Sequence, residues 1–191
     1  AGRTYKARLI RGEVDETYEN LPLGENNRLI DSHLHHNRVA GALVSYQKDF
    51  IADGNHLAWN GHEADGGTGY GIAALAGSYN FGVTFQNNTT DHNYRKGLDV
   101  HEGNDIVIKD NTAIGDRLYG IAVYNRQFTM DNVKITGNTI IQDPDFRLDV
   151  NDNPRYTYHG YAGIQVQTNT QFKDLKSADT GYFEISGNTI K

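Results

Sequence analysis

The segment Tyr94–Gly103 concentrates side chains that could perform acid–base or charge-stabilising chemistry. It places two cations, a carboxylate, an imidazole and a second carboxylate within eight residues. Charged residues are ordinary on the outward face of a soluble strand, but here they alternate with the apolar residues Leu98 and Val100. The pattern continues at Tyr124 and Arg126 further along the chain. This alternation favours a functional site over a solvated strand.

One chemistry that fits these groups is β-elimination on a uronic acid. A lyase of this kind must neutralise a carboxylate, remove the adjacent C5 proton and return a proton to the leaving oxygen. We interpret His101 and Tyr124 as the base and the acid, with a nearby cation as the neutralising group. The candidate catalytic residues are His101, Tyr124, Arg95, Lys96 and Asp99.

Glycoside hydrolysis is the alternative chemistry. It requires two carboxyl groups about 5–9.5 Å apart. Asp99 could form such a pair with Glu102, or with Asp116 further along the chain. The lyase has more of its groups in phase on one face, so β-elimination is the favoured interpretation. A glycan-binding or structural protein without catalysis is the third alternative.

Short repeated strands must position these groups, because one phrase recurs along the chain. Ile135–Ile140 and Ile185–Ile190 match almost residue for residue, and looser copies precede them. A second phrase, Gly-apolar-x-apolar, alternates with the first. Two interleaved strand motifs with a long irregular period predict a solenoid, whereas antiparallel hairpins would place turns every ~8–12 residues. The anchor position of the first phrase falls at residues 33, 55, 88, 111, 138 and 188.

The predicted fold is therefore all-β, a right-handed parallel β-helix of about six coils. It covers residues 26–191, and residues 1–25 form a leading region. Asparagine at the anchor position tolerates φ > 0 and can stack in a ladder between coils. Because Ile190 and Lys191 continue a core strand, we expect a segment of a longer β-helix, or an end that a partner caps.

The phase of the second phrase predicts which side chains face solvent. Side chains alternate between the two faces of a strand, so the apolar residues point inward and each phrase's glycine points outward. Coils stack about 4.8 Å apart, which makes His101 and Tyr124 neighbours, flanked by Gln167. A column of glycines beside this line predicts a trough for a linear polymer. The glycines are Gly41, Gly71, Gly97, Gly120 and Gly163.

Three insertions interrupt the repeat, at residues 59–70, 142–161 and 173–182. Insertions in a solenoid collect on one face and often bind ligands. The longest insertion carries tyrosines whose rings could stack on sugars. The candidate substrate-binding residues are Arg126, Gln165, Gln167, Arg155, Tyr156 and Tyr158.

Composition and charge exclude several classes of function. The net charge of −6 argues against a nucleic-acid partner. The sequence has no run of about 18 apolar residues, so no membrane span is predicted, and without cysteine there is no thiolate metal site. His33 and His35 share a strand face and could begin a metal site, but no third ligand with recognisable spacing follows.

We therefore predict no metal site and no cofactor. The acidic stretch at residues 143–153 has enough oxygen ligands for Ca²⁺, but it lacks the spacing of an EF-hand, and a solvated loop is the preferred interpretation.

The phrase Arg95–His101, followed by Ile106–Asn111, resembles the pectate-lyase-like superfamily of right-handed parallel β-helices. Within that superfamily, the chain is similar to the tailspike depolymerases of bacteriophages, including capsule lyases. The resemblance covers residues 26–191. It implies a polysaccharide substrate, a homotrimeric spike on a virion or another extracellular location, and a site on the solenoid surface or between subunits. It does not separate lyase from hydrolase, because the architecture hosts both.

Overall fold

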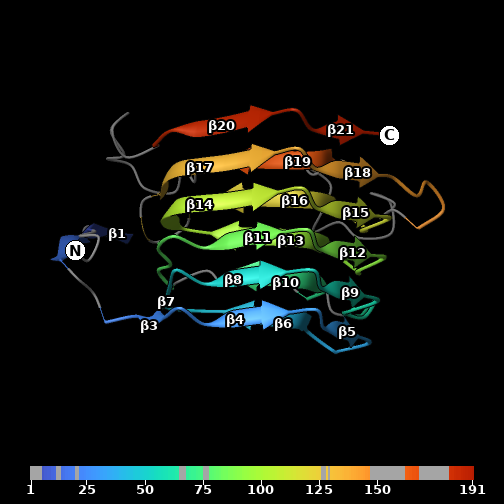
Figure 1. Ribbon diagram of the computed structural model, residues 1–191, viewed down its shortest axis with the longest axis horizontal. Coiled ribbons are helices and arrows are strands. Elements are labelled where there is room, and N and C mark those ends of the chain that lie inside the picture. Colours follow the sequence, from blue (N-terminus) through green and yellow to red (C-terminus); the bar gives the residue numbers. More distant parts are fainter. Residues whose placement is uncertain are drawn as a thin grey trace.

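The computed structural model describes most of the chain and shows a solenoid of parallel strands (Figure 1). All regular structure in the described residues is β-strand, which confirms the all-β parallel β-helix. The described residues are 6–11, 14–19, 22–64, 68–74, 78–125, 128, 130–146, 162–167 and 181–191.

Three parallel sheets run along the solenoid, and each coil before the one that contains β20 and β21 contributes one strand to each sheet. Sheet 1 contains β4 (Arg28–Ile30), β8 (Ile51–Asp53), β11 (Thr84–Gln86), β14 (Gly103–Lys109), β17 (Met130–Thr136) and β20 (Phe183–Ser186). Sheet 2 contains β5 (His33–His35), β9 (His56–Ala58), β12 (Thr89–Asp91), β15 (Thr112–Ile114), β18 (Thr139–Ile141) and β21 (Thr189–Ile190). Sheet 3 contains β6 (Ala40–Val44), β10 (Tyr70–Ala74), β13 (Lys96–His101), β16 (Tyr119–Tyr124) and β19 (Ala162–Gln167).

Two smaller pairs of strands accompany the three sheets. The parallel strands β3 (Gly24–Glu25) and β7 (Gln47–Lys48) form a short pair. Strands β1 (Lys6–Arg11) and β2 (Val14–Glu19) pair antiparallel.

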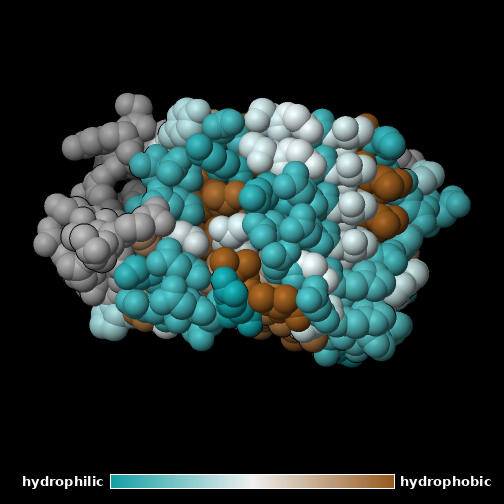
Figure 2. Space-filling view, viewed as in Figure 1, coloured by the Kyte–Doolittle hydropathy of each residue, from teal (hydrophilic) through white to brown (hydrophobic). Residues whose placement is uncertain are grey.

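The core is a narrow stack of apolar side chains inside the coils. Ala52, Phe85, Ile108 and Ile135 occupy one register position of sheet 1, and each is fully buried. Burying a large apolar side chain of this kind contributes about 1.5–3 kcal/mol relative to leaving it in water. In sheet 1 the opposite phase of the strands is partly exposed, and Figure 2 shows that hydrophilic residues predominate on the outward face of this sheet.

The predicted asparagine ladder is present between sheets 1 and 2. Every amide before that of Asn188 donates to the side-chain oxygen of the next coil at 2.9–3.0 Å, and all of them, Asn188 included, donate to a backbone carbonyl of the preceding coil. In the first coil the anchor is Ser32, whose backbone N–H donates to Asn55, while His33 pairs with His56. The expected anchor at position 33 is therefore wrong by one residue. The ladder consists of Asn55, Asn88, Asn111, Asn138 and Asn188.

A second ladder of polar side chains, which the sequence motifs did not predict, lies in the turn after sheet 2. Asn37 donates to Asn60 at 2.9 Å, and Asn60 donates to Asn93 at 2.8 Å. The next coil places an aspartate in this position, and Asn93 donates to Asp116 Oδ1 at 2.8 Å. The hydroxyl of Thr90 donates to the other oxygen of Asp116 at 2.5 Å.

The glycine column points into the solenoid, contrary to the prediction of an outward trough of bare backbone. A Cβ on Gly97 would lie 2.3 Å from Thr90 Oγ1, and one on Gly120 would lie 2.8 Å from the interior side chain of Ile140. These glycines stand at the corner where the chain turns into sheet 3. Only glycine fits there, because a Cβ at this position would clash with side chains of sheet 2 and with the backbone of the next coil.

Candidate functional site

Sheet 3 brings together the residues that strand phase predicted to be neighbours. His101 pairs in register with Tyr124, and Tyr124 pairs with Gln167 on the following strand. The rings of His101 and Tyr124 lie 3.9 Å apart between centroids, at an interplanar angle of 49°. The inward-pointing residues of β13, Leu98 and Val100, are fully buried in the core, as predicted.

A buried ionic cluster occupies the other side of β13. Lys96 Nζ donates to Asp99 Oδ1 at 3.0 Å, and His101 Nε2 lies 2.7 Å from Asp99 Oδ2. The exposed fractions are 2% for Lys96, 1% for Asp99 and 6% for His101. The prediction that Asp99 and His101 face solvent is therefore wrong. Because Gly97 turns inward at the corner, Lys96 reaches Asp99 three residues later on the same side of the strand.

Electrostatics keep Asp99 ionised in this cluster. Burial alone would raise the pKa of Asp99, but the charges and hydrogen bonds of His101 and Lys96 outweigh burial and lower the pKa to about 2. Burial lowers the pKa of Lys96, and the attraction of Asp99 opposes this only in part. The ammonium group also lies 4.8 Å from the centroid of Tyr124, a cation–π contact.

The proton arrangement of His101 follows from the ionised carboxylate. Asp99 has no proton to donate, so the Nε2 of His101 carries the proton that they share. In neutral imidazole Nδ1 then presents a lone pair. This Nδ1 is buried, and within the described part of the chain it has no hydrogen-bond partner. An oriented imidazole with a free lone pair is the arrangement of a general base.

Two tyrosines that the sequence analysis did not select surround Lys96. Tyr70 and Tyr119 are its register neighbours on the adjacent strands, and their ring centroids lie 5.7 and 5.9 Å from Lys96 Nζ. The hydroxyl of Tyr70 accepts a bond from Arg95 Nη1 at 3.2 Å. Gln165 Nε2 lies 3.3 Å from the hydroxyl of Tyr119. The available signal was their position, since each directly precedes a glycine of the column.

Of the carboxyl pairs considered for hydrolysis, Asp99 and Asp116 lie on opposite sides of β13. Asp116 lies on the interior side of β13, where a Cβ on Gly97 would approach it to 2.2 Å. Asp99 lies on the opposite side of that strand, and both of its oxygens are hydrogen-bonded. Burial raises the pKa of Asp116 to about 7, against the effect of the bonds from Thr90 and Asn93. Glu102 is fully buried at the bend between β13 and β14.

Of the candidate substrate-binding residues, the structure describes only Gln165 and Gln167. On β19, Gln167 pairs in register with Tyr124 and Gln165 pairs with Ala122. Gln165 Nε2 donates to Gln167 Oε1 at 3.2 Å. The other four substrate-binding candidates lie outside the described residues; they are Arg126, Arg155, Tyr156 and Tyr158.

A second polar cluster ties the turn after β12 to the residues after β18. His92 bonds to Asp91 through Nδ1 and to Asp143 through Nε2, the latter at 2.9 Å. Burial lowers the pKa of His92, but the two carboxylates outweigh burial and raise the pKa above its ordinary value. The imidazole also stacks on Trp59, with 4.8 Å between centroids and 7° between planes.

Metal-binding and membrane-spanning features were also sought in the described residues. No group of three or more histidine, aspartate or glutamate side chains among them could hold a metal ion. The same part of the chain contains no apolar helix of membrane-spanning length.

Comparison with known proteins gives one match. A family model described as "Right handed beta helix region" matches residues 21–190. Comparisons with curated proteins and with solved structures found no significant match for the chain.

Proposed function

The chain belongs to the right-handed β-helix family, and from this premise we propose that it binds and depolymerises a host-surface polysaccharide by β-elimination at a uronate residue. The observation that carries the proposal is the buried Nδ1 of His101, a lone pair without a partner in the described residues, held in place by an ionised carboxylate. The fold itself supports a glycan partner, because its long parallel sheets suit a linear polymer.

In the proposed reaction, His101 Nδ1 removes the C5 proton of the uronate, and Asp99 stabilises the imidazolium that forms. The C4–O bond then breaks, a C4–C5 double bond forms, and Tyr124 returns a proton to the departing oxygen. The cations Lys96 and Arg95 stabilise the carboxylate-bearing intermediate. Because His101 is only 6% exposed, the partly exposed ring of Tyr124 must shift to admit the glycan.

A non-catalytic glycan-binding or structural β-helix is the second candidate. Burial of Lys96 and Asp99 favours it, because a fully paired internal ion cluster can serve the fold alone. Hydrolysis has less geometric support, since Asp99 and Asp116 face opposite sides of β13. A homotrimeric spike on a virion, or another secreted form, remains part of the proposal through the resemblance to tailspike depolymerases.

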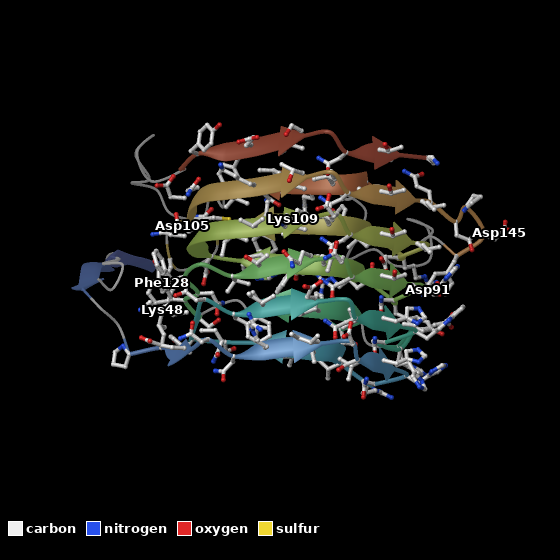
Figure 3. All side chains as sticks on the ribbon, in the orientation of Figure 1. Lys48, Asp91, Asp105, Lys109, Phe128 and Asp145 are labelled. Carbon is white, nitrogen blue, oxygen red and sulfur yellow. The ribbon has the colours of Figure 1, made fainter. Side chains whose placement is uncertain are left out.

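The test is incubation with a panel of uronate-containing capsular glycans, following the ultraviolet absorbance of the unsaturated product. His101→Gln and Tyr124→Phe should each lower kcat at least ~100-fold. The matched control is Lys109→Gln, a change on the outward face of sheet 1 (Figure 3), which should keep full activity. Full activity in both site variants would overturn the assignment. New reducing ends without absorbance would indicate a hydrolase, and binding without products would indicate the second candidate.

A further inference from the structure

The imidazole of His92 joins the turn after β12 to the residues that follow β18. Its Nδ1 bonds to Asp91, the last residue of β12. Its Nε2 lies 2.9 Å from Oδ2 of Asp143, which comes two residues after the end of β18. Figure 3 shows Asp91 and Asp145 at the same end of the coils. We call residues 143–146 the strap.

Phe146 packs the far end of the strap against side chains from three successive coils. Its ring centroid lies 5.3 Å from that of Trp59, 5.2 Å from that of His92 and 5.3 Å from that of Tyr94. The guanidinium carbon of Arg117 lies 5.5 Å from the same centroid, a cation–π contact. The strap is therefore held at two points, by the ion pairs of His92 and by the packing of Phe146.

The two bonds of the His92 ring each require a proton. An ionised carboxylate can only accept a hydrogen bond, so each ring nitrogen must carry a proton to donate to one. Neutral imidazole has a single N–H, and its other nitrogen would present a lone pair to a carboxylate oxygen. The bond with His92 lowers the pKa of Asp143, which keeps that carboxylate ionised. The observed contacts are therefore those of the imidazolium form.

We propose that the strap is a pH-sensitive latch, which is held on the solenoid while His92 is charged and is released at Asp143 when His92 loses a proton. Asp91 stays beside His92 in either state, because it belongs to β12 and pairs with Ala58 and Ile114 on the adjacent strands. Asp143 lies beyond β18 and can move away. The latch stands at the start of the insertion at residues 142–161, and it is independent of any activity on glycans.

The charges that face the ring set the direction of the switch. Burial lowers the pKa of His92, but the bonds and charges of Asp91 and Asp143 outweigh burial and raise the pKa above its ordinary value. Because the pKa is the higher one in the closed state, the latch is fully stabilised below pH ~6.5 and loses this stabilisation as pH rises through the raised pKa.

Other charged or titratable groups lie around the latch. His56 Nε2 is 3.6 Å from Asp91 Oδ2, so His56 competes for Asp91 but not for the carboxylate of the strap. Arg117, which faces Phe146, lies 4.0 Å from a carboxylate oxygen of Glu63. Asp145 is exposed, and its backbone N–H donates to Asp143 Oδ1 at 2.9 Å. Within the described residues, the ion pairs of His92 are those with Asp91 and Asp143.

The test compares the wild-type full chain with His92→Gln by NMR and measures exchange of the Asp145 and Phe146 amides, which both donate to Asp143. Comparison of the two proteins at one pH cancels the intrinsic dependence of exchange on pH. At pH 5.5 both amides should exchange at least ~10-fold faster in His92→Gln, because glutamine carries no charge to hold Asp143. At pH 9 the two proteins should exchange at the same rate.

Asp143→Asn is the second variant, because it removes the charge of the strap and leaves His92 in place. It should speed exchange at pH 5.5 by a similar factor and lower the pH at which the His92 ring titrates. Trp59 is the only tryptophan of the chain, so its indole resonance can be assigned directly and reports release through its contact with Phe146.

The matched control is His35→Gln, because His35 is an exposed histidine on β5 outside the latch. It should exchange as the wild type does at both pH values, and circular dichroism should show the native spectrum for every variant. Equal exchange in the wild type and His92→Gln at pH 5.5 would overturn the proposal. So would a difference of the same size at pH 5.5 and pH 9, because the contact would then be independent of the charge of His92.

Discussion

Asp116 stands where the preceding coils of the second ladder carry asparagine, and replacing it with asparagine should make the protein more stable at neutral and alkaline pH. An asparagine there keeps its oxygen for the bonds from Asn93. Its amide can donate to the carbonyl of Thr90, as Asn60 and Asn93 donate to the corresponding carbonyls of Leu34 and Leu57. The substitution removes a buried carboxyl group and leaves the ladder complete.

The magnitude follows from the pKa of Asp116, which burial raises from 3.8 to about 7. Because the folded-state pKa is the higher one, the contribution of Asp116 to stability is fully present below pH ~4 and is lost as pH rises through about 7. A difference of about three pH units corresponds to on the order of 4 kcal/mol. The stability advantage of Asp116→Asn over the wild type should therefore grow by a few kcal/mol between pH 4 and 8.

Urea unfolding of both proteins across this pH range measures the effect, since all other titrating groups are common to the two chains. Asp110→Asn is the control for the same change of side chain at an exposed aspartate, where no buried carboxyl group is removed. Thr90→Val should cost more in the wild type than in Asp116→Asn, because the hydroxyl is a donor to the carboxylate. A pH-independent difference, or a variant less stable at pH 8, would refute the reasoning.

Two further predictions concern the ionic clusters. His92→Gln should remove stability that the wild type has below pH ~6.5 and loses as pH rises through the raised pKa of His92, so the two melting curves should converge at alkaline pH. Lys96→Met should lower the free energy of unfolding by about 3–5 kcal/mol, because it leaves Asp99 buried without its ammonium partner. Adding Asp99→Leu should recover part of that loss, and a single variant within ~1 kcal/mol of the wild type would contradict the burial argument.

Repetition and strand phase were sufficient to predict the β-helix, the first asparagine ladder and the pairing of His101 with Tyr124. These features depend on local alternation and on one residue type recurring at one place in each coil. The same reasoning placed the anchor of the first coil at His33 instead of Ser32, because this coil lacks asparagine at its anchor.

The burial of Lys96 and Asp99 could not be predicted, because strict alternation fails at a corner. Gly97 and Leu98 are consecutive and both point inward, so Lys96 before them lies on the same face of the strand as Asp99 after them. The second ladder was hidden for another reason. Its members follow sheet 2 in a turn with no repeated phrase, and Asp116 breaks the asparagine pattern.

Because the corner glycines point inward, the connection that precedes sheet 3 can differ in length from coil to coil without changing the register of the strands in that sheet. The chain passes from Ala58 to Tyr70 in one coil, from Asp91 to Lys96 in the next, and from Ile114 to Tyr119 in the third. Despite these unequal lengths, Ile72, Leu98 and Ile121 remain in register. The corner glycine fixes where the strand of sheet 3 begins in these coils. The connection from sheet 2 to sheet 3 is therefore the place where a foreign loop can be inserted without changing the strand register.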